Sequence, residues 1–184
     1  MLNIVYIFKK GRKARINKKT KFPSEFFYGL IELKKNKLYI NLLEDSDLGL
    51  APPLSFLPRY LNKLSFFLPN VPVGMFICLF YKKFLNKINS YDVIIPTTNT
   101  IGLTIGLGKR LNIIRGKIFF ISMGLLNKVS KNWHLKLIGF LLEKVELISI
   151  SETERLFLEK KLNRKVHYIP FGVDLNFWKP KKFK

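Results

Sequence analysis

The sequence is poor in the residues that build disulfides and metal centres. It contains one cysteine, Cys78, and two histidines, His134 and His167. A single cysteine excludes an intramolecular disulfide framework and a metal site built on several cysteines. Two histidines disfavour a histidine-built metal centre. We therefore expect no metal site.

Long hydrophobic runs are also lacking. The longest apolar stretch covers the eleven residues 71–81 and contains Pro72. A helix of that length cannot cross a bilayer core of about 30 Å. At the amino terminus the apolar residues precede the positive charges, which is the reverse of a secretory signal. We expect a cytoplasmic protein, with a peripheral position on the inner face of the cytoplasmic membrane as the alternative.

Acidic residues are scarce, with 12 Asp and Glu against 33 Lys and Arg, for a net charge of +21. Such a charge favours polyanionic partners. Lysine outnumbers arginine 26 to 7, which an AT-rich genome also produces, so function and compositional bias both account for the charge. Apolar residues make up 48% of the 184 residues, enough for the core of one domain.

Short apolar runs alternate with helical patterns along the chain. The order predicts right-handed crossovers and an α/β fold, with a doubly wound, mainly parallel sheet and helices on both faces. The basic segment 9–21 is expected to be a loop. Strands are predicted at 2–8, 38–43, 92–96, 117–122, 146–150 and 166–169, and helices at 23–36, 59–67, 73–88, 100–111, 133–144 and 151–162. Ser151 and Glu154 form a capping-box pattern at the start of the last helix.

Several catalytic and nucleotide-binding motifs are absent. Only Gly11 follows the first strand, so a dinucleotide fingerprint is missing. The glycines of segment 102–108 resemble a P-loop, but their spacing is one residue too long and Arg110 replaces the Ser or Thr. We expect them to allow close helix–strand packing. Ser122 lacks a nucleophile elbow, and the acidic cluster 44–47 is expected to be solvated.

The carboxyl-terminal part carries the most specific pattern. Residues 149–160 read SISETERLFLEK, and residues 166–180 read VHYIPFGVDLNFWKP. Together they resemble the end of the amino-terminal domain of GT-B glycosyltransferases of the family 4-like kind. Phe171 stands where that family more often has Asn. The matching positions are Ser151, Glu152, Ile169, Pro170, Gly172, Val173, Asp174, Phe177 and Pro180.

The resemblance implies a domain division and a reaction class. Residues 1–170 would form the Rossmann-like acceptor-side domain, and residues 171–184 would form the junction to a donor-binding domain. A nucleotide sugar would be a substrate, with no cofactor, and turnover would require the donor domain in cis or in trans. A truncated gene, a split gene, an excised half and a stand-alone domain all remain open.

The resemblance also implies the site residues. The acceptor would meet the loops that follow three strands, where Met123 replaces the family's histidine and leaves no general base at that position. The basic loop also fits a solvated segment. The acceptor-binding candidates are Gly11, Arg12, Lys13, Arg15, Thr98, Asn99, Ser122 and Gly124. The junction candidates are Ser151, Glu152, Pro170, Gly172 and Asp174, with Gly172 expected to permit a turn that a side chain would obstruct.

The expected partner is a glycan or a lipid-linked acceptor from cell-surface polysaccharide or lipopolysaccharide synthesis. Segment 64–85 mixes six aromatic residues with Lys82 and Lys83, which fits either a membrane-interface segment or a core helix with a basic end. The alternative function is a non-catalytic binding domain or subunit whose basic surface meets anionic membrane or nucleic acid. Nucleic acid is disfavoured because no helix-turn-helix, zinc-finger or RNP signature is present.

Overall fold

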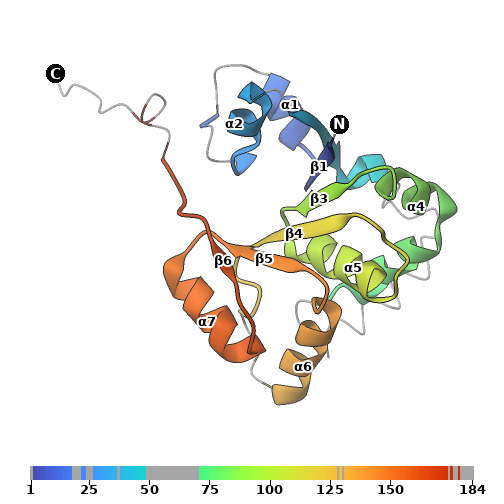
Figure 1. Cartoon of the computed structure of the whole chain (residues 1–184), viewed down its shortest axis with the longest axis vertical. Helices are drawn as coiled ribbons and strands as arrows, with labels where there is room; N and C mark the ends of the chain where they lie inside the picture. The colour runs from blue at the N-terminus through green and yellow to red at the C-terminus, as the bar shows by residue number, and fades with distance from the viewer. Residues whose placement is uncertain are drawn as a thin grey trace.

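The computed structural model in Figure 1 describes most of the chain. The described residues are 2–17, 22–23, 27–36, 38–48, 71–127, 129, 131–173, 175 and 178. The helix expected at 59–67 lies outside them.

One six-stranded sheet organises the chain, and every strand pair in it is parallel. The spatial order is β2-β1-β3-β4-β5-β6, so the chain changes direction once, at β1. This confirms the predicted doubly wound α/β fold with a parallel sheet. The strands are β1 (Asn3–Phe8), β2 (Tyr39–Glu44), β3 (Val93–Pro96), β4 (Lys117–Ser122), β5 (Glu146–Ser149) and β6 (His167–Tyr168).

Helices cover both faces of the sheet, and each face has its own apolar core. In Figure 1 α1 and α2 lie on one side of the strands, and α5, α6 and α7 lie on the other. The larger core packs β-strand side chains against η3, α4, α5, α6 and α7, and the smaller core packs them against α1 and residues 27–33. The helical elements are α1 (Arg12–Asn17), α2 (Leu30–Lys35), η2 (Asp45–Leu48), η3 (Val73–Phe80), α4 (Lys82–Ile88), α5 (Asn99–Arg110), α6 (Asn132–Leu141) and α7 (Glu152–Leu162).

Two predicted helices differ from the observed ones because of local backbone geometry. Within the helix expected at 23–36, residues 24–26 lie outside the described residues, and α2 begins at Leu30, directly after Tyr28 and Gly29 with φ values of 49° and 77°. The helix expected at 73–88 consists of the 3-10 helix η3 and the α-helix α4. Extended backbone at Tyr81, with φ −88° and ψ 111°, separates the two.

The glycines of α5 allow its close packing, and the predicted helix–strand packing holds for Gly102, whereas Gly106 packs against a helix. A Cβ added at Gly102 would lie 2.5 Å from the Phe120 ring of β4. One added at Gly106 would lie 2.7 Å from the carbonyl oxygen of Leu141 at the end of α6. Backbone cannot yield as a flexible side chain can, so Gly106 sets how closely α5 and α6 approach.

Replacing Gly106 with alanine is expected to destabilise the fold by about 1–3 kcal/mol, because the clash with Leu141 outweighs the gain in helix propensity. The matched control is Gly139→Ala in α6, where an added Cβ meets no atom within 4 Å. That control should gain up to about 1 kcal/mol. Urea unfolding of both variants measures the difference. Equal effects at the two glycines would contradict the packing role of Gly106.

Candidate functional site

The candidate site lies at the carboxyl edge of the sheet, where the loops after β1, β3 and β4 meet. The Thr97 hydroxyl donates to the Ile7 carbonyl at 3.0 Å and ties the end of β3 to β1. The Asn99 amide donates to the Met123 carbonyl at 2.9 Å and ties the start of α5 to the loop after β4. The strand order reverses between β1 and β3, and ligands of doubly wound sheets bind in the crevice at such a point.

The loop after β1 forms the short helix α1, and acidic residues hold its backbone. The backbone N–H of Lys10 donates to Asp45 Oδ1 at 2.9 Å. The backbone N–H of Lys13 donates to Glu44 Oε1 at 2.6 Å. These bonds explain why part of the basic segment is helical, and they correct the expectation of a solvated acidic cluster, since Glu44 is only 8% exposed.

Asp47 completes the acidic anchor of α1. Its Oδ2 accepts from the backbone N–H of Glu44 at 3.0 Å and pairs with Lys13 Nζ at 2.9 Å. The backbone hydrogen bond and then the bond from the Lys13 ammonium hold the pKa of Asp47 below its ordinary value. Lys13 is one of the residues that we expected to bind the acceptor. Its positive charge is instead paired with a carboxylate of the same chain.

The two arginines of α1 have different neighbours. The Arg15 guanidinium lies 5.0 Å from the centroid of the Phe22 ring, a cation–π contact. Arg12 lies close enough to Tyr28 to oppose the rise in the pKa of the Tyr28 hydroxyl that burial causes. The Tyr28 hydroxyl also donates to Met123 Sδ at 3.5 Å. Tyr28 therefore contacts the loop after β4, a role that the sequence did not indicate.

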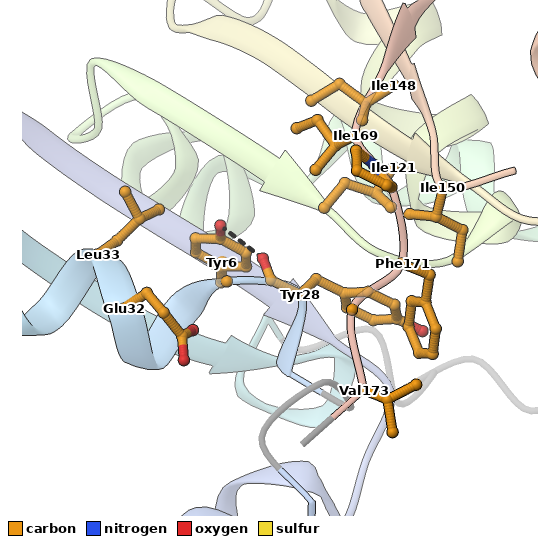
Figure 2. Close-up of a pocket in the computed structure, with 13 residues that line it drawn as sticks. Tyr6, Tyr28, Glu32, Leu33, Ile121, Ile148, Ile150, Ile169, Phe171 and Val173 are labelled. Carbon is orange, nitrogen blue, oxygen red and sulfur yellow. Dashed lines mark hydrogen bonds between the residues drawn. The ribbon is translucent and has the colours of Figure 1, made fainter. Parts of the chain in front are cut away.

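A cavity of about 530 Å³ lies beside Tyr28 on the face of the sheet that α2 covers. Figure 2 shows aliphatic side chains from β4 and β5 on one side and Tyr6 and Tyr28 on the other. The Tyr6 hydroxyl donates to the Tyr28 carbonyl at 3.2 Å, and burial raises the pKa of Tyr6 to about 12. Sequence reasoning missed this cavity because it forms between segments far apart in the chain.

The expected residues after β3 and β4 come together, with mainly structural contacts. The Thr98 hydroxyl caps α5 by accepting from the Ile101 N–H at 3.5 Å. Ser122 is fully buried, and its hydroxyl donates to Glu154 Oε1 at 3.3 Å. Gly124 has a φ of 61°, which a glycine adopts without strain. Of the residues after these two strands, Asn99 and Gly124 are therefore the best placed to meet a ligand.

The capping-box prediction at Ser151 is half right. The Ser151 hydroxyl accepts from the backbone N–H of Glu154 at 3.5 Å, as expected. The Ser149 hydroxyl, however, accepts from the Ser151 N–H at 3.3 Å. The carboxylate of Glu154 instead reaches the loop after β4, where it accepts from the Leu125 N–H at 3.4 Å and from Ser122. Glu154 thus fixes the position of this loop.

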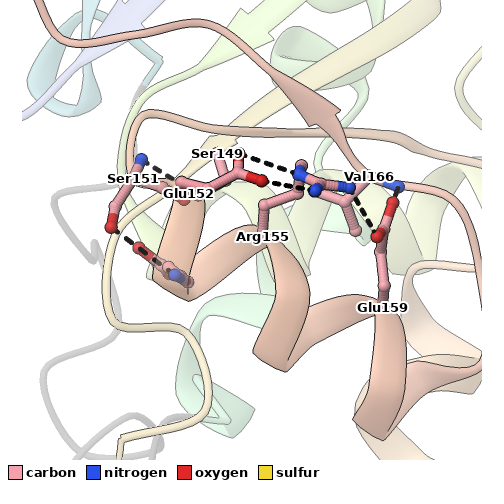
Figure 3. Close-up of polar contacts among 7 residues, drawn as sticks. Ser149, Ser151, Glu152, Arg155, Glu159 and Val166 are labelled. Atoms are coloured by element: carbon pink, nitrogen blue, oxygen red, sulfur yellow. Dashed lines mark hydrogen bonds and ion pairs between the residues drawn. The ribbon is translucent and has the colours of Figure 1, made fainter.

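The expected junction residues lie at the ends of β5 and β6, which are neighbours in the sheet. Figure 3 shows Glu152 paired with Arg155, which also binds Glu159. The Glu159 carboxylate accepts from the Val166 N–H at 3.0 Å and thereby joins α7 to the start of β6. Glu152 therefore belongs to a network that holds the last helix against the sheet.

The segment that leaves β6 corrects one expectation. Pro170 follows β6 by two residues, in keeping with its lack of a ladder donor. Gly172, however, does not adopt a positive φ, and a Cβ added there meets nothing within 4 Å. The expected turn that a side chain would obstruct is therefore absent at Gly172. Asp174 lies outside the described residues.

Comparison with known proteins gives no family for this chain: no family model, curated protein or solved structure matches it. Within the described ranges, no cluster of three or more His, Cys, Asp or Glu residues could hold a metal ion. None of the helices described is both long enough and apolar enough to span a membrane.

Replacing Asp47 with asparagine should lower stability at neutral pH. The folded pKa of Asp47 lies below its unfolded value of 3.8, so its stabilising effect is present above that value and is lost as the pH falls through the folded pKa. The urea midpoints of wild type and Asp47→Asn should therefore differ at pH 7 and converge as the pH falls below 3.8. Lys13→Met, which keeps the stronger bond from Glu44, should show a smaller version of this effect. A difference in urea midpoint that does not change with pH would contradict the role of the Asp47 carboxylate in holding α1.

Proposed function

We propose that this chain is the acceptor-binding half of a GT-B glycosyltransferase that uses a nucleotide sugar in cell-surface polysaccharide or lipopolysaccharide synthesis. The observation that carries the proposal is the placement of the two segments that resemble this family. Ser149 of the SISE segment pairs with Tyr168, and its carbonyl accepts from the Ile169 N–H at 3.0 Å. Both segments therefore leave neighbouring strands at the same edge of the sheet.

The carboxyl edge supports the same proposal. The loops after β1, β3 and β4 meet there, and Asn99 and Gly124 lie beside Met123, which is 44% exposed. The Asn99 side chain offers an amide oxygen besides the N–H that it donates to Met123, and glycan hydroxyls are donors for such a group. In this proposal the chain binds and orients the acceptor, and a donor-binding domain, in cis or in trans, supplies the groups that stabilise the transition state.

Asn99→Ala should weaken binding of an oligosaccharide by about tenfold, because it removes the amide and releases the loop after β4. The measurement is a binding panel of short cell-surface oligosaccharides, followed by calorimetry on the best-retained member. The matched control is Asn89→Ala at the opposite edge, where the amide donates to the Ile113 carbonyl and accepts from the Arg115 N–H. That control should lower stability and leave the affinity unchanged.

Two outcomes would contradict the proposed function. In one, wild-type protein retains no member of the oligosaccharide panel. In the other, Asn99→Ala and Asn89→Ala change the affinity equally, so that binding depends on the fold and not on the carboxyl edge.

We also propose that the chain meets an anionic membrane through the turn between η3 and α4. Phe80 is 84% exposed, and the exposed Lys82 and Lys83 follow it. The other described aromatics of this region, including Phe84 and Tyr81, pack into the core. An exposed aromatic ring beside two lysines suits the interface of a bilayer that contains anionic lipid.

The triple variant Phe80→Ala, Lys82→Ala, Lys83→Ala should bind vesicles with phosphatidylglycerol at least tenfold more weakly than wild type. The matched control removes one aromatic residue and two lysines from α7, as Phe157→Ala, Lys160→Ala and Lys161→Ala. It should keep more than half of the wild-type binding in a sedimentation assay. Equal losses in the two variants would show that net charge alone drives the binding.

A further inference from the structure

The cavity of about 530 Å³ is lined by α2 on one side, through Glu32 and Leu33, and by side chains of β4 and β5 on its floor. Ile121 of β4 and Ile148 of β5 belong to the smaller core, on the side of α1 and α2. The described helices that contribute to that core come from residues 12–35, next to β1 and β2, whereas α5, α6 and α7 belong to the other core. The part of this face formed by β4 and β5 is therefore where the cavity opens.

The segment after β6 forms one wall of the cavity. Ile169, Phe171 and Val173 line the cavity and are 45–59% exposed. Pro170 and Gly172 line the cavity as well, so five consecutive residues of this segment form the wall and three of them contribute large apolar side chains. Figure 2 draws Phe171 and Val173 with Tyr28 among the side chains that line the cavity.

Few polar groups face the cavity, and this restricts the ligand. The Tyr6 hydroxyl is already bonded to the Tyr28 carbonyl. Among the described residues of the lining, Glu32 is the only charged one. A sugar buried here would leave its hydroxyls without partners, which costs free energy, whereas an aliphatic chain needs none. The volume falls in the usual range for a small-ligand pocket.

The polar surroundings lie at one end of the cavity. Tyr28 lines it and also contacts Met123, whose carbonyl binds Asn99. Arg12 acts on the Tyr28 hydroxyl from the side of α1. A ligand with an apolar chain in the cavity would therefore have its head group at the carboxyl edge, where hydrogen bonds join Tyr28, Met123 and Asn99.

We propose that this cavity binds the aliphatic chain of a lipid-linked acceptor whose anionic head group lies beside Arg12 and Asn99. The assignment to an acceptor rests on the proposed function, since the sugar would then be added at the carboxyl edge. Binding of the chain itself depends only on the cavity, so the two can be tested separately.

The test is calorimetry with hexyl, octyl and decyl phosphate, each below its micelle concentration, and with inorganic phosphate. Affinity should rise by about fourfold for each added methylene until the cavity is full. Val173→Trp, which fills the cavity from an exposed position, should lower the affinity for decyl phosphate at least tenfold. The matched control Leu175→Trp alters a residue that is 77% exposed and does not line the cavity, and it should bind as wild type does.

Two results would overturn the proposal that the cavity binds an aliphatic chain. One is an affinity that does not depend on chain length. The other is an unchanged affinity in Val173→Trp when its thermal unfolding matches that of wild type. Dimerisation of the protein in sedimentation velocity, lost in Val173→Trp, would assign the cavity to a second copy of the chain and would also overturn the proposal.

Two further comparisons distinguish a failure of the cavity proposal from a failure of the proposed function. Decanoate also has a ten-carbon chain, but its head group is a carboxylate. Tighter binding of decanoate than of decyl phosphate would indicate that the cavity binds a free fatty acid, and it would overturn the proposal of a lipid-linked acceptor. If decyl phosphate binds in the cavity and no oligosaccharide binds the protein, the lipid site stands and the glycosyltransferase proposal fails. If oligosaccharides bind without any effect of an alkyl chain, the cavity proposal alone fails.

Discussion

The arrangement of this molecule depends on β1 and its position between β2 and β3. The side chains of β1 alternate between the two cores, with Val5 and Ile7 in the larger one and Ile4, Tyr6 and Phe8 in the smaller one. The strand is therefore buried on both faces, as strands inside parallel sheets are. Because β2 and β3 lie on opposite sides of β1, the strand order reverses there, and doubly wound sheets bind their ligands at the carboxyl edge beside such a point.

Acidic residues are few, and their positions matter more for that reason. Glu44, Asp45 and Asp47 bind backbone or ammonium groups of Lys10 and Lys13, at the start of α1 and just before it. Glu152 and Glu159 pair with Arg155 of α7, and Glu154 holds the loop after β4. Six of the twelve acidic residues of the chain thus hold elements that flank the carboxyl edge. The remaining excess of positive charge makes these elements dependent on their acidic partners.

The fold could be predicted well from the sequence, because short apolar runs that alternate with helical patterns leave few other topologies. The packing role of the α5 glycines was also predictable from their place inside a helix. The short helix α1 was not, because its backbone is held by carboxylates more than thirty residues away in the chain. The late start of α2 depends on a positive φ at Tyr28, a residue that gives no such signal in a sequence.

The candidate site was predictable only in outline. The rule that loops at the carboxyl ends of strands carry function located Asn99 and Gly124, but it did not show that Ser122 is buried against Glu154. Tyr28 and the cavity depend on contacts between α2, β4, β5 and the segment after β6. Such contacts between distant segments leave no local pattern, so only the structure displays them.

The most direct test of the account is a residue-resolved map of ligand binding. The ¹⁵N-labelled chain would be titrated with the best-retained oligosaccharide, and amide shifts would be followed by NMR. The account predicts shifts at Gly11, Asn99 and Gly124, on three different loops of the carboxyl edge, and none at Asn89 or Gly116 on the opposite edge. Shifts confined to the opposite edge, or to the lysines of α7, would contradict the assignment of the carboxyl edge as the binding edge.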